Sequence, residues 1–259
     1  MQIFWYVFFI VLGLLIASFL NVCMDRLPAN KSVVKPPSHC DSCNRRLSGE
    51  DLIPVFSYLV SRGRCRYCGA RIPLRVLLVE VITGALFGFL FWRFGLSPEF
   101  GIGAFYSCIF ILIIAIDFEH GLILNKIVYP SMVAALIINL VFSVLFLEWQ
   151  IIVNALIGGV SGFIIFFLIV LISRGGMGFG DVKLAGLIGI ALGWKSGLVG
   201  ILIGVILGGL VAIILLALKI KRRKQAIPFG PFLSIGAIVA LLYGREIMDW
   251  YLYHLMGIY

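Results

Sequence analysis

The chain has 259 residues, of which 62% are hydrophobic and only 13% are charged, and its formal net charge is +9. A soluble domain of this length carries about twice that share of charged side chains, so a water-soluble enzyme or binding module is excluded. Apolar stretches of about 20 residues recur along the chain, each long enough to cross roughly 30 Å of hydrocarbon as a helix. The sequence therefore predicts an all-α polytopic membrane protein.

About eight transmembrane helices are expected. The first is interpreted as a span and not as a signal peptide, because it lacks a basic leading region and an A-x-A-like cleavage site. The sixth is short and rich in glycine, so its limits are the least well defined. The predicted spans are 3–22, 75–94, 101–118, 125–146, 151–172, 182–194, 197–218 and 229–244.

The basic residues predict the orientation of these spans. All 21 lysines and arginines except Arg93, Lys195 and Arg245 fall in loops on one side of the predicted topology. The positive-inside rule then places the segment 23–75 in the cytoplasm and both termini outside. A basic surface can also bind nucleic acid, but the position of these charges beside the spans favours the lipid bilayer as the partner, with no nucleic acid.

The segment between the first two spans contains two C-x-x-C pairs, Cys40 with Cys43 and Cys65 with Cys68, separated by 21 residues. Two such pairs suit a tetrahedral zinc ion. Two disulfides, a redox pair and an iron–sulfur cluster are the alternatives, but stable disulfides are rare in the cytoplasm. Because four thiolates leave no open position on zinc, the ion is predicted to be structural. A first helix (1–22) and a cytoplasmic four-cysteine zinc module (23–74) are thus expected.

Two aspartates are predicted to meet at one side of the membrane. Asp117 ends the third span, and Asp181 opens the sixth span after a glycine-rich run. These spans run in opposite directions, so both carboxyl groups lie at the cytoplasmic end. Ionisable residues at membrane depth are costly and are functional candidates by default.

A carboxyl pair of this kind can hydrolyse a peptide bond. Two acids close together in a low-dielectric site share one proton, so that one activates water while the other polarises the scissile carbonyl. Gly178 and Gly180 would leave room for an extended substrate. The alternatives are that Asp181 caps a helix, that Asp117 only marks a span end, or that both form a proton or cation relay in a transporter or channel.

Five stretches match one known family in the order in which that family has them. They are Ser18–Pro28, the two-pair segment Cys40–Arg75, Asp117–His120, Gly176–Leu184 and Pro228–Phe232. On these residues the chain resembles the bacterial type IV prepilin peptidases, which are GxGD-type intramembrane aspartyl proteases. The chain departs from the usual pattern after the first aspartate, where Leu124 replaces a common proline and Asn125 a common acidic residue.

The resemblance implies that Asp117 and Asp181 are the catalytic dyad of a protease domain at 75–259. It implies cleavage of a basic leader from prepilins and pseudopilins at the cytoplasmic face of the bacterial inner membrane. Many members then methylate the new N-terminus with S-adenosylmethionine. The acidic groups Asp117, Glu119 and Glu80 are expected to line the route of the basic leader, although Glu80 could instead pair at the helix end with Arg75. A zinc-bearing assembly factor without catalytic activity is a further alternative.

Overall fold

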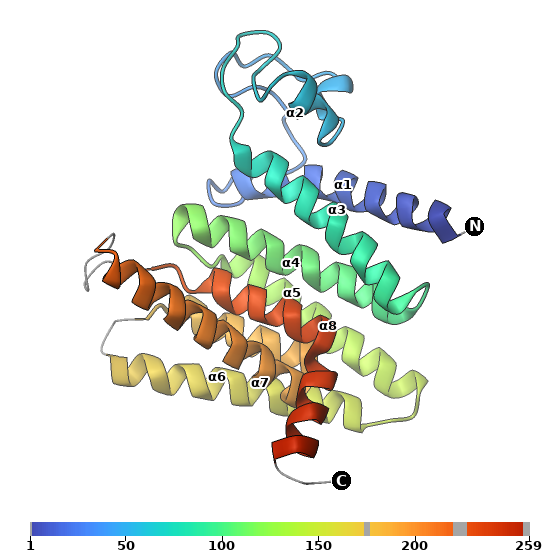
Figure 1. Cartoon of the computed structure of the whole chain (residues 1–259), viewed down its shortest axis with the longest axis vertical. Coiled ribbons are helices and arrows are strands. Elements are labelled where there is room, and N and C mark those ends of the chain that lie inside the picture. Colours follow the sequence, from blue (N-terminus) through green and yellow to red (C-terminus); the bar gives the residue numbers. More distant parts are fainter. Residues whose placement is uncertain (1, 174–176, 220–226, 256–259) are drawn as a thin grey trace. The chain divides into compact units, whose positions relative to one another are not determined.

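The computed structural model describes residues 2–173, 177–219 and 227–255 (Figure 1). Within these ranges the chain is helical, and its only β-structure is two isolated bridges in the cysteine-bearing segment. Seven of the described helices are long and apolar enough to cross a membrane. The all-α membrane fold is confirmed. The elements are α1 Gln2–Arg26, η1 Glu50–Leu52, α2 Phe56–Val60, α3 Leu74–Phe94, α4 Pro98–His120, α5 Asn125–Leu145, α6 Gln150–Ser173, α7 Phe179–Ala217 and α8 Gly230–Leu255.

The chain forms two compact units, Met1–Leu112 and Ile113–Tyr259. The first contains α1, the cysteine-bearing segment, α3 and most of α4, and the second contains the end of α4 and the helices α5 to α8. The division predicted from the sequence, at residues 22 and 74, separates the cysteine-bearing segment from the membrane helices. It is a different kind of division from the two compact units, and it stays a prediction.

In the first unit, α1 and α3 pack closely because glycines face each other. A Cβ atom on Gly13 would lie 3.0 Å from the Cα atom of Gly84, and one on Gly84 would lie 2.8 Å from Leu14 Cδ2. Small residues allow membrane helices to approach in this way. The ring of Phe9 fills the space beside this contact, with its centroid 4.5 Å from that of Phe100.

In the second unit, glycines also bring neighbouring helices into close contact. A Cβ atom on Gly189 of α7 would lie 2.0 Å from the carbonyl oxygen of Gly158 on α6. On the other side, a Cβ atom on Gly236 of α8 would lie 2.2 Å from the carbonyl oxygen of Gly200 on α7. Neither contact has room for a side chain, so α7 is held between α6 and α8 by backbone packing.

Helix α7 is broken at Gly193, whose φ of 75° and ψ of 174° are not helical. A Cβ atom on Gly197 would lie 3.0 Å from the Cα atom of Gly189, whereas eight residues of a straight helix would separate these positions by about 12 Å. The chain therefore reverses direction at Gly193. The 39 residues of α7 form two antiparallel segments, which correspond to the predicted spans 182–194 and 197–218.

A polar side chain supports this break. The Nδ2 group of Asn139 on α5 donates a hydrogen bond of 3.1 Å to the carbonyl oxygen of Ile190. Backbone groups at membrane depth must find partners within the protein, and a break in the helix interrupts the regular pairing. Asn139 thus supplies a donor where the helix of α7 ends its first segment.

Candidate active site and metal centre

Both predicted aspartates lie in the second unit and both are buried. Asp117 is in the last turn of α4 and is 4% exposed, while Asp181 is in the first turn of α7 and is 7% exposed. The two carboxyl groups are near enough to interact electrostatically. The structure thus brings together the two acids that the sequence predicted to meet.

Ile123 connects the surroundings of the two aspartates. A Cβ atom on Gly180, the residue before Asp181, would lie 2.9 Å from Ile123 Cβ. A Cβ atom on Gly230 would lie 3.1 Å from Ile123 Cδ1. The side chain that follows α4 therefore packs against the start of α7 and the start of α8 together.

The start of α8 faces Asp117. A Cβ atom on Gly230 would lie only 2.7 Å from Asp117 Oδ2, so a larger residue at this position would displace the carboxyl group. The backbone N–H of Gly230 is directed at the same carboxyl group, and the next residue, Pro231, has no N–H to offer. The N-terminus of a helix carries partial positive charge, and α8 directs this end at Asp117.

Asp181 lies at a second helix N-terminus. It is the third residue of α7, after the N-cap Gly178, and the N–H of Gly178 is directed at its carboxyl group. Asp181 is therefore not the N-cap residue considered from the sequence, although a carboxyl group at this third position can accept from the N–H of the N-cap residue. Capping alone, however, does not require the burial of Asp181 beside a second acid.

The four cysteines converge in the first unit. Their Sγ atoms all lie within 4.8 Å of one another, and those of Cys40 and Cys68 are 3.8 Å apart. Tetrahedral zinc with Zn–S distances of about 2.3 Å requires sulfur atoms about 3.8 Å apart. The four side chains therefore fit a structural zinc ion.

The two halves of the cysteine cluster share one backbone pattern. The N–H of Cys40 donates to the carbonyl of Arg45, and the N–H of Cys65 donates to that of Ala70, at 3.0 and 2.7 Å. Each turn then uses a residue with positive φ, Asn44 at 53° and Gly69 at 72°. Asparagine and glycine tolerate this conformation best, so each C-x-x-C pair is built as the same tight turn.

Backbone donors prepare Cys40 for metal binding. The N–H groups of Cys43 and Ser42 point at its sulfur and lower the pKa of the thiol to about 6. The thiolate is the form that binds zinc.

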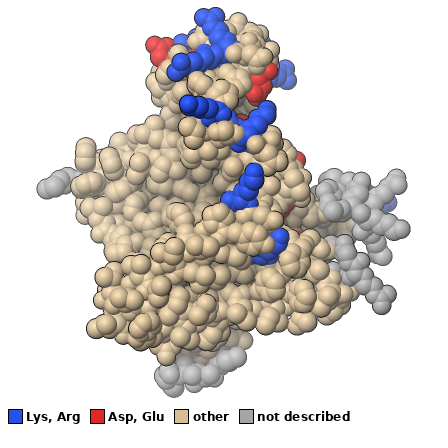
Figure 2. All heavy atoms as spheres, turned by 180° about the vertical axis from the view of Figure 1, so that it is seen from behind, with Lys and Arg blue, Asp and Glu red and all other residues tan. Residues whose placement is uncertain are grey.

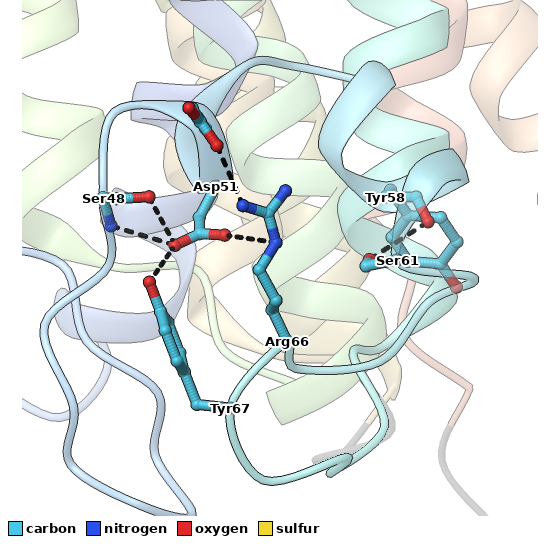
Figure 3. A network of polar contacts seen from close by, with 7 residues as sticks. Ser48, Asp51, Tyr58, Ser61, Arg66 and Tyr67 are labelled. Carbon is cyan, nitrogen blue, oxygen red and sulfur yellow. Dashed lines mark hydrogen bonds and ion pairs between the residues drawn. The ribbon is translucent and has the colours of Figure 1, made fainter.

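A polar network joins Ser48 and Asp51 to Arg66 and Tyr67 (Figure 3), two residues that lie between Cys65 and Cys68 in the sequence. The carboxylate of Asp51 accepts hydrogen bonds from the backbone N–H of Ser48, from its hydroxyl and from the hydroxyl of Tyr67, at 3.0, 2.8 and 3.1 Å. Together with the nearby Arg66 guanidinium, these donors hold the pKa of Asp51 below its usual value. Arg66 also pairs with Glu50 at 2.9 Å.

The chain is similar to known proteins over nearly its whole length. Residues 11–94 match the bacterial peptidase A24 N-terminal domain, and residues 104–213 match the type IV leader peptidase family. A prepilin leader peptidase/N-methyltransferase of Bacillus subtilis is 32% identical over 95% of this chain and 98% of its own length. A protein of the same name from Pseudomonas aeruginosa is 33% identical over 94% of this chain and 92% of its own. The chain belongs to the type IV leader peptidase family. No solved structure matches it.

The departures of this chain from the usual pattern of the type IV leader peptidases lie at the start of α5. Asn125 accepts a hydrogen bond of 2.8 Å from Lys183 Nζ, so a neutral amide oxygen is the partner of this lysine. The lysine also lies over the rings of Tyr129 and Phe179, 5.4 and 5.2 Å from their centroids. This contact links the start of α5 to the turn of α7 that carries Asp181.

The substrate-binding roles expected for four other residues of this leader peptidase remain predictions. A Cβ atom on Gly178 would make only an ordinary contact of 3.7 Å with Asp181 Oδ2, whereas Gly180 is crowded by Ile123. Glu119 is exposed, with Oε2 4.0 Å from His120 Nε2. Glu80 is buried in the first unit and accepts a hydrogen bond of 2.7 Å from the N–H of Val55.

Sequence reasoning missed the roles of Gly230 and Ile123. Gly230 belongs to the family stretch Pro228–Phe232, and its signal is a glycine between two prolines at the start of a predicted span. Nothing in the sequence marks Ile123. Several predicted features lie outside the described residues, namely Gly176 at the start of the glycine-rich stretch and the loop charges Arg174, Lys221, Arg222, Arg223 and Lys224.

Proposed function

We propose that this chain cleaves the basic leader from type IV prepilins and pseudopilins, with Asp117 and Asp181 as the catalytic pair, and then N-methylates the new N-terminus. Membership of the leader peptidase family and the names of its relatives support both activities. The observation that carries the catalytic assignment is the burial of two interacting carboxyl groups in one unit. A proton or cation relay is not favoured, because the relatives are named as peptidases.

The chemistry follows from the surroundings of the two acids. One carboxylate takes a proton from a water molecule while the oxygen of that water attacks the scissile carbonyl carbon. At the same time, the protonated carboxyl group donates a hydrogen bond to the carbonyl oxygen. The tetrahedral intermediate then collapses. The carboxyl group that took the proton from water passes it to the leaving amine, and the other carboxylate takes a proton back from a hydroxyl group of the intermediate. The starts of α7 and α8 stabilise the negative charge that the pair retains through these steps.

The remaining assignments concern the module and the orientation. Zinc on the four cysteines holds the fold of residues 23–74 and takes no part in hydrolysis, and S-adenosylmethionine is the methyl donor of the second step. The module and the scissile bond lie on the cytoplasmic side of the inner membrane, with both termini outside. The distribution of basic residues supports this orientation.

Glu80 and Glu119 are proposed to attract the basic leader. Reversal of both charges, with Glu80→Lys and Glu119→Lys, is expected to weaken cleavage through a higher KM. Because Glu80 also contacts Val55, Glu119→Lys alone is measured beside the double variant. Cleavage kinetics unchanged in both variants would remove this part of the proposal.

Mass spectrometry of a prepilin incubated with the purified protein tests the function, with and without S-adenosylmethionine. Loss of the leader is expected, followed by a methyl group on the new N-terminus when the donor is present. Asp117→Asn and Asp181→Asn should each abolish cleavage, while Asp249→Asn, a like change in the same unit, should not. A prepilin from the same genome that stays intact would refute the peptidase, and full activity in either aspartate variant would refute the pair.

A further inference from the structure

The cysteine module presents an apolar face on its short helix. Phe56, Leu59 and Val60 of α2 are 60%, 61% and 55% exposed. Their spacing of three and four residues places them on one side of the helix. Tyr58 turns to the other side, where its ring lies against Gly63 and its hydroxyl reaches the carbonyl of Ile72 at 3.5 Å. The apolar face of α2 therefore points away from the interior of the module.

A partly buried hydrogen bond fixes the start of α2 against a membrane helix. The N–H of Val55, the residue before α2, donates to Glu80 Oε2 of α3 at 2.7 Å. Val55 is the centre of a tight turn in which the N–H of Phe56 donates to the carbonyl of Pro54, and its φ is 62°. Turns of this type are rare and strained for a branched residue, so they persist only where other contacts hold them. The hydrogen bond to Glu80 is such a contact, and it holds the start of α2 in a defined place.

The depth of this hydrogen bond in the membrane follows from the position of Glu80 along α3. The ion pair of Arg75 and Asp25 joins the start of α3 to the end of α1, and charged residues at the ends of spans lie at the membrane surface. Glu80 is five residues further along α3, which is about 7.5 Å deeper at 1.5 Å per residue. An amphipathic helix at a membrane surface buries its apolar face by about 5–10 Å. The start of α2 is thus at the depth of the lipid interface.

The charges beside α2 complement an anionic membrane surface. Arg62 and Arg64 follow the helix directly and both are exposed. The acids nearest in sequence, Glu50 and Asp51, are already paired with Arg66. On the face shown in Figure 2, lysine and arginine side chains gather on the module beside a few acidic ones, and the body below it shows only a few more basic side chains. Basic residues close to a membrane are attracted to anionic lipids.

We propose that α2 lies in the cytoplasmic leaflet of the bilayer, with Phe56, Leu59 and Val60 among the acyl chains and Arg62 and Arg64 on the phosphates of anionic phospholipids. The zinc module, which lies between α1 and α3 in the chain, then contacts the membrane in addition to these two helices. This interface is independent of the catalytic assignment, since all of its residues lie in the first unit and none of them is an aspartate of the pair.

Photocrosslinking tests the apolar part of this interface. The full chain, with benzoylphenylalanine in place of Phe56, is placed in nanodiscs of phosphatidylcholine and phosphatidylglycerol and irradiated. Mass spectrometry should find phospholipid attached at residue 56. The control carries the same group in place of Val34, which is also in the module and 76% exposed, and should give several-fold less lipid adduct.

Two outcomes would overturn the proposal. One is an adduct from residue 56 to residues 113–259 of the chain or to an added prepilin, which would show that the apolar face binds protein. The other is a lipid adduct no greater than that of the Val34 control.

The headgroup preference tests the basic part. Adducts of the Phe56 variant should favour phosphatidylglycerol over phosphatidylcholine, and Arg62→Gln with Arg64→Gln should reduce this preference by up to roughly fivefold for each arginine. Arg93→Gln, at the other end of α3, is the matched control and should leave the preference unchanged. An equal preference with and without the two arginines would contradict their contact with anionic lipid.

Discussion

The cysteine cluster and the aspartate pair both join residues that are far apart in the sequence, but they do so by different means. The cysteine turns are local structures with hydrogen bonds over five residues, and a metal ion is expected to supply the long-range link between them. The aspartates are joined through whole helices, whose approach depends on glycines such as Gly189 and Gly230. The first region thus depends on ligand chemistry, and the second depends on the absence of side chains.

The largest effect that separates the two regions is expected from Cys65→Ser. Structural zinc contributes about 10 kcal/mol or more to the folding of small zinc modules, so the variant should lose its zinc and the order of the module. The thermal unfolding of the membrane helices should change little. Zinc content by mass spectrometry and unfolding by circular dichroism measure the two properties.

Cys108→Ser is the control for this change, since Cys108 is not part of the cluster. It should keep its zinc. A Cys65→Ser protein that still holds zinc at the native level would contradict the four-sulfur site.

The second region should respond most to Gly189→Ala. The new Cβ atom would lie 2.0 Å from the carbonyl oxygen of Gly158, and backbone must move to accept it. Overpacking of this kind costs about 1–3 kcal/mol or more, so the unfolding temperature of the membrane helices should fall while zinc content stays constant.

Gly209→Ala provides the matched comparison on the same helix, because nothing lies within 4 Å of its new Cβ atom. It should be neutral or slightly stabilising. Equal stabilities for the two variants would show that close backbone contact at Gly189 does not hold α6 and α7 together.

Gly230→Ala should affect activity more than stability. Its Cβ atom would displace the carboxyl group of Asp117, and a misplacement of about 1 Å can reduce a rate by about 100-fold. We expect kcat for prepilin cleavage to fall by roughly 10- to 100-fold, measured beside Gly209→Ala. If kcat stays at the native level, Asp117 does not act from the position seen here.

The smallest effect is expected from Asp51→Asn in the module. Since the pKa of Asp51 is held below its usual value, its carboxylate stabilises the folded module fully above the unfolded pKa of about 3.9. That contribution is lost as the pH falls through the folded pKa. At neutral pH the variant should release zinc to a chelator a few times faster than the native protein.

Asp41→Asn removes the same charge from an exposed position of the module, and it controls for the general effect of charge on zinc release. If both variants release zinc equally fast, the hydrogen bonds of Asp51 do not stabilise the module.

The sequence predicted best those features that depend on a short pattern. Apolar length located the helices, and the spacing of Cys40, Cys43, Cys65 and Cys68 predicted the cluster, because each C-x-x-C turn is determined by a few neighbouring residues. The convergence of Asp117 and Asp181 followed from the direction of two spans. Each of these inferences needs only local chemistry or the parity of the helices.

Other features depend on contacts between helices and had no local signal. The broken helix α7 was expected as two spans, but the reversal at Gly193 and its donor Asn139 could not be read from either segment. The position of Gly230 against Asp117 requires the packing of α8 on α7. The contact of Glu80 with the N–H of Val55 could not be foreseen, because it depends on a strained turn.

The reversal at Gly193 has a consequence for how the protein enters its membrane. The first segment of α7, residues 179–192, would extend only about 21 Å at 1.5 Å per residue, which is less than the roughly 30 Å of hydrocarbon in a bilayer. This segment also carries the carboxyl group of Asp181 near its start. It is therefore poorly suited to pass from the translocon into the lipid without a partner helix. Because Gly197 packs back on Gly189, we expect the segments before and after Gly193 to partition into lipid together, as one helical hairpin. The second segment of α7, which is longer and apolar, would then place Asp181 below the membrane surface.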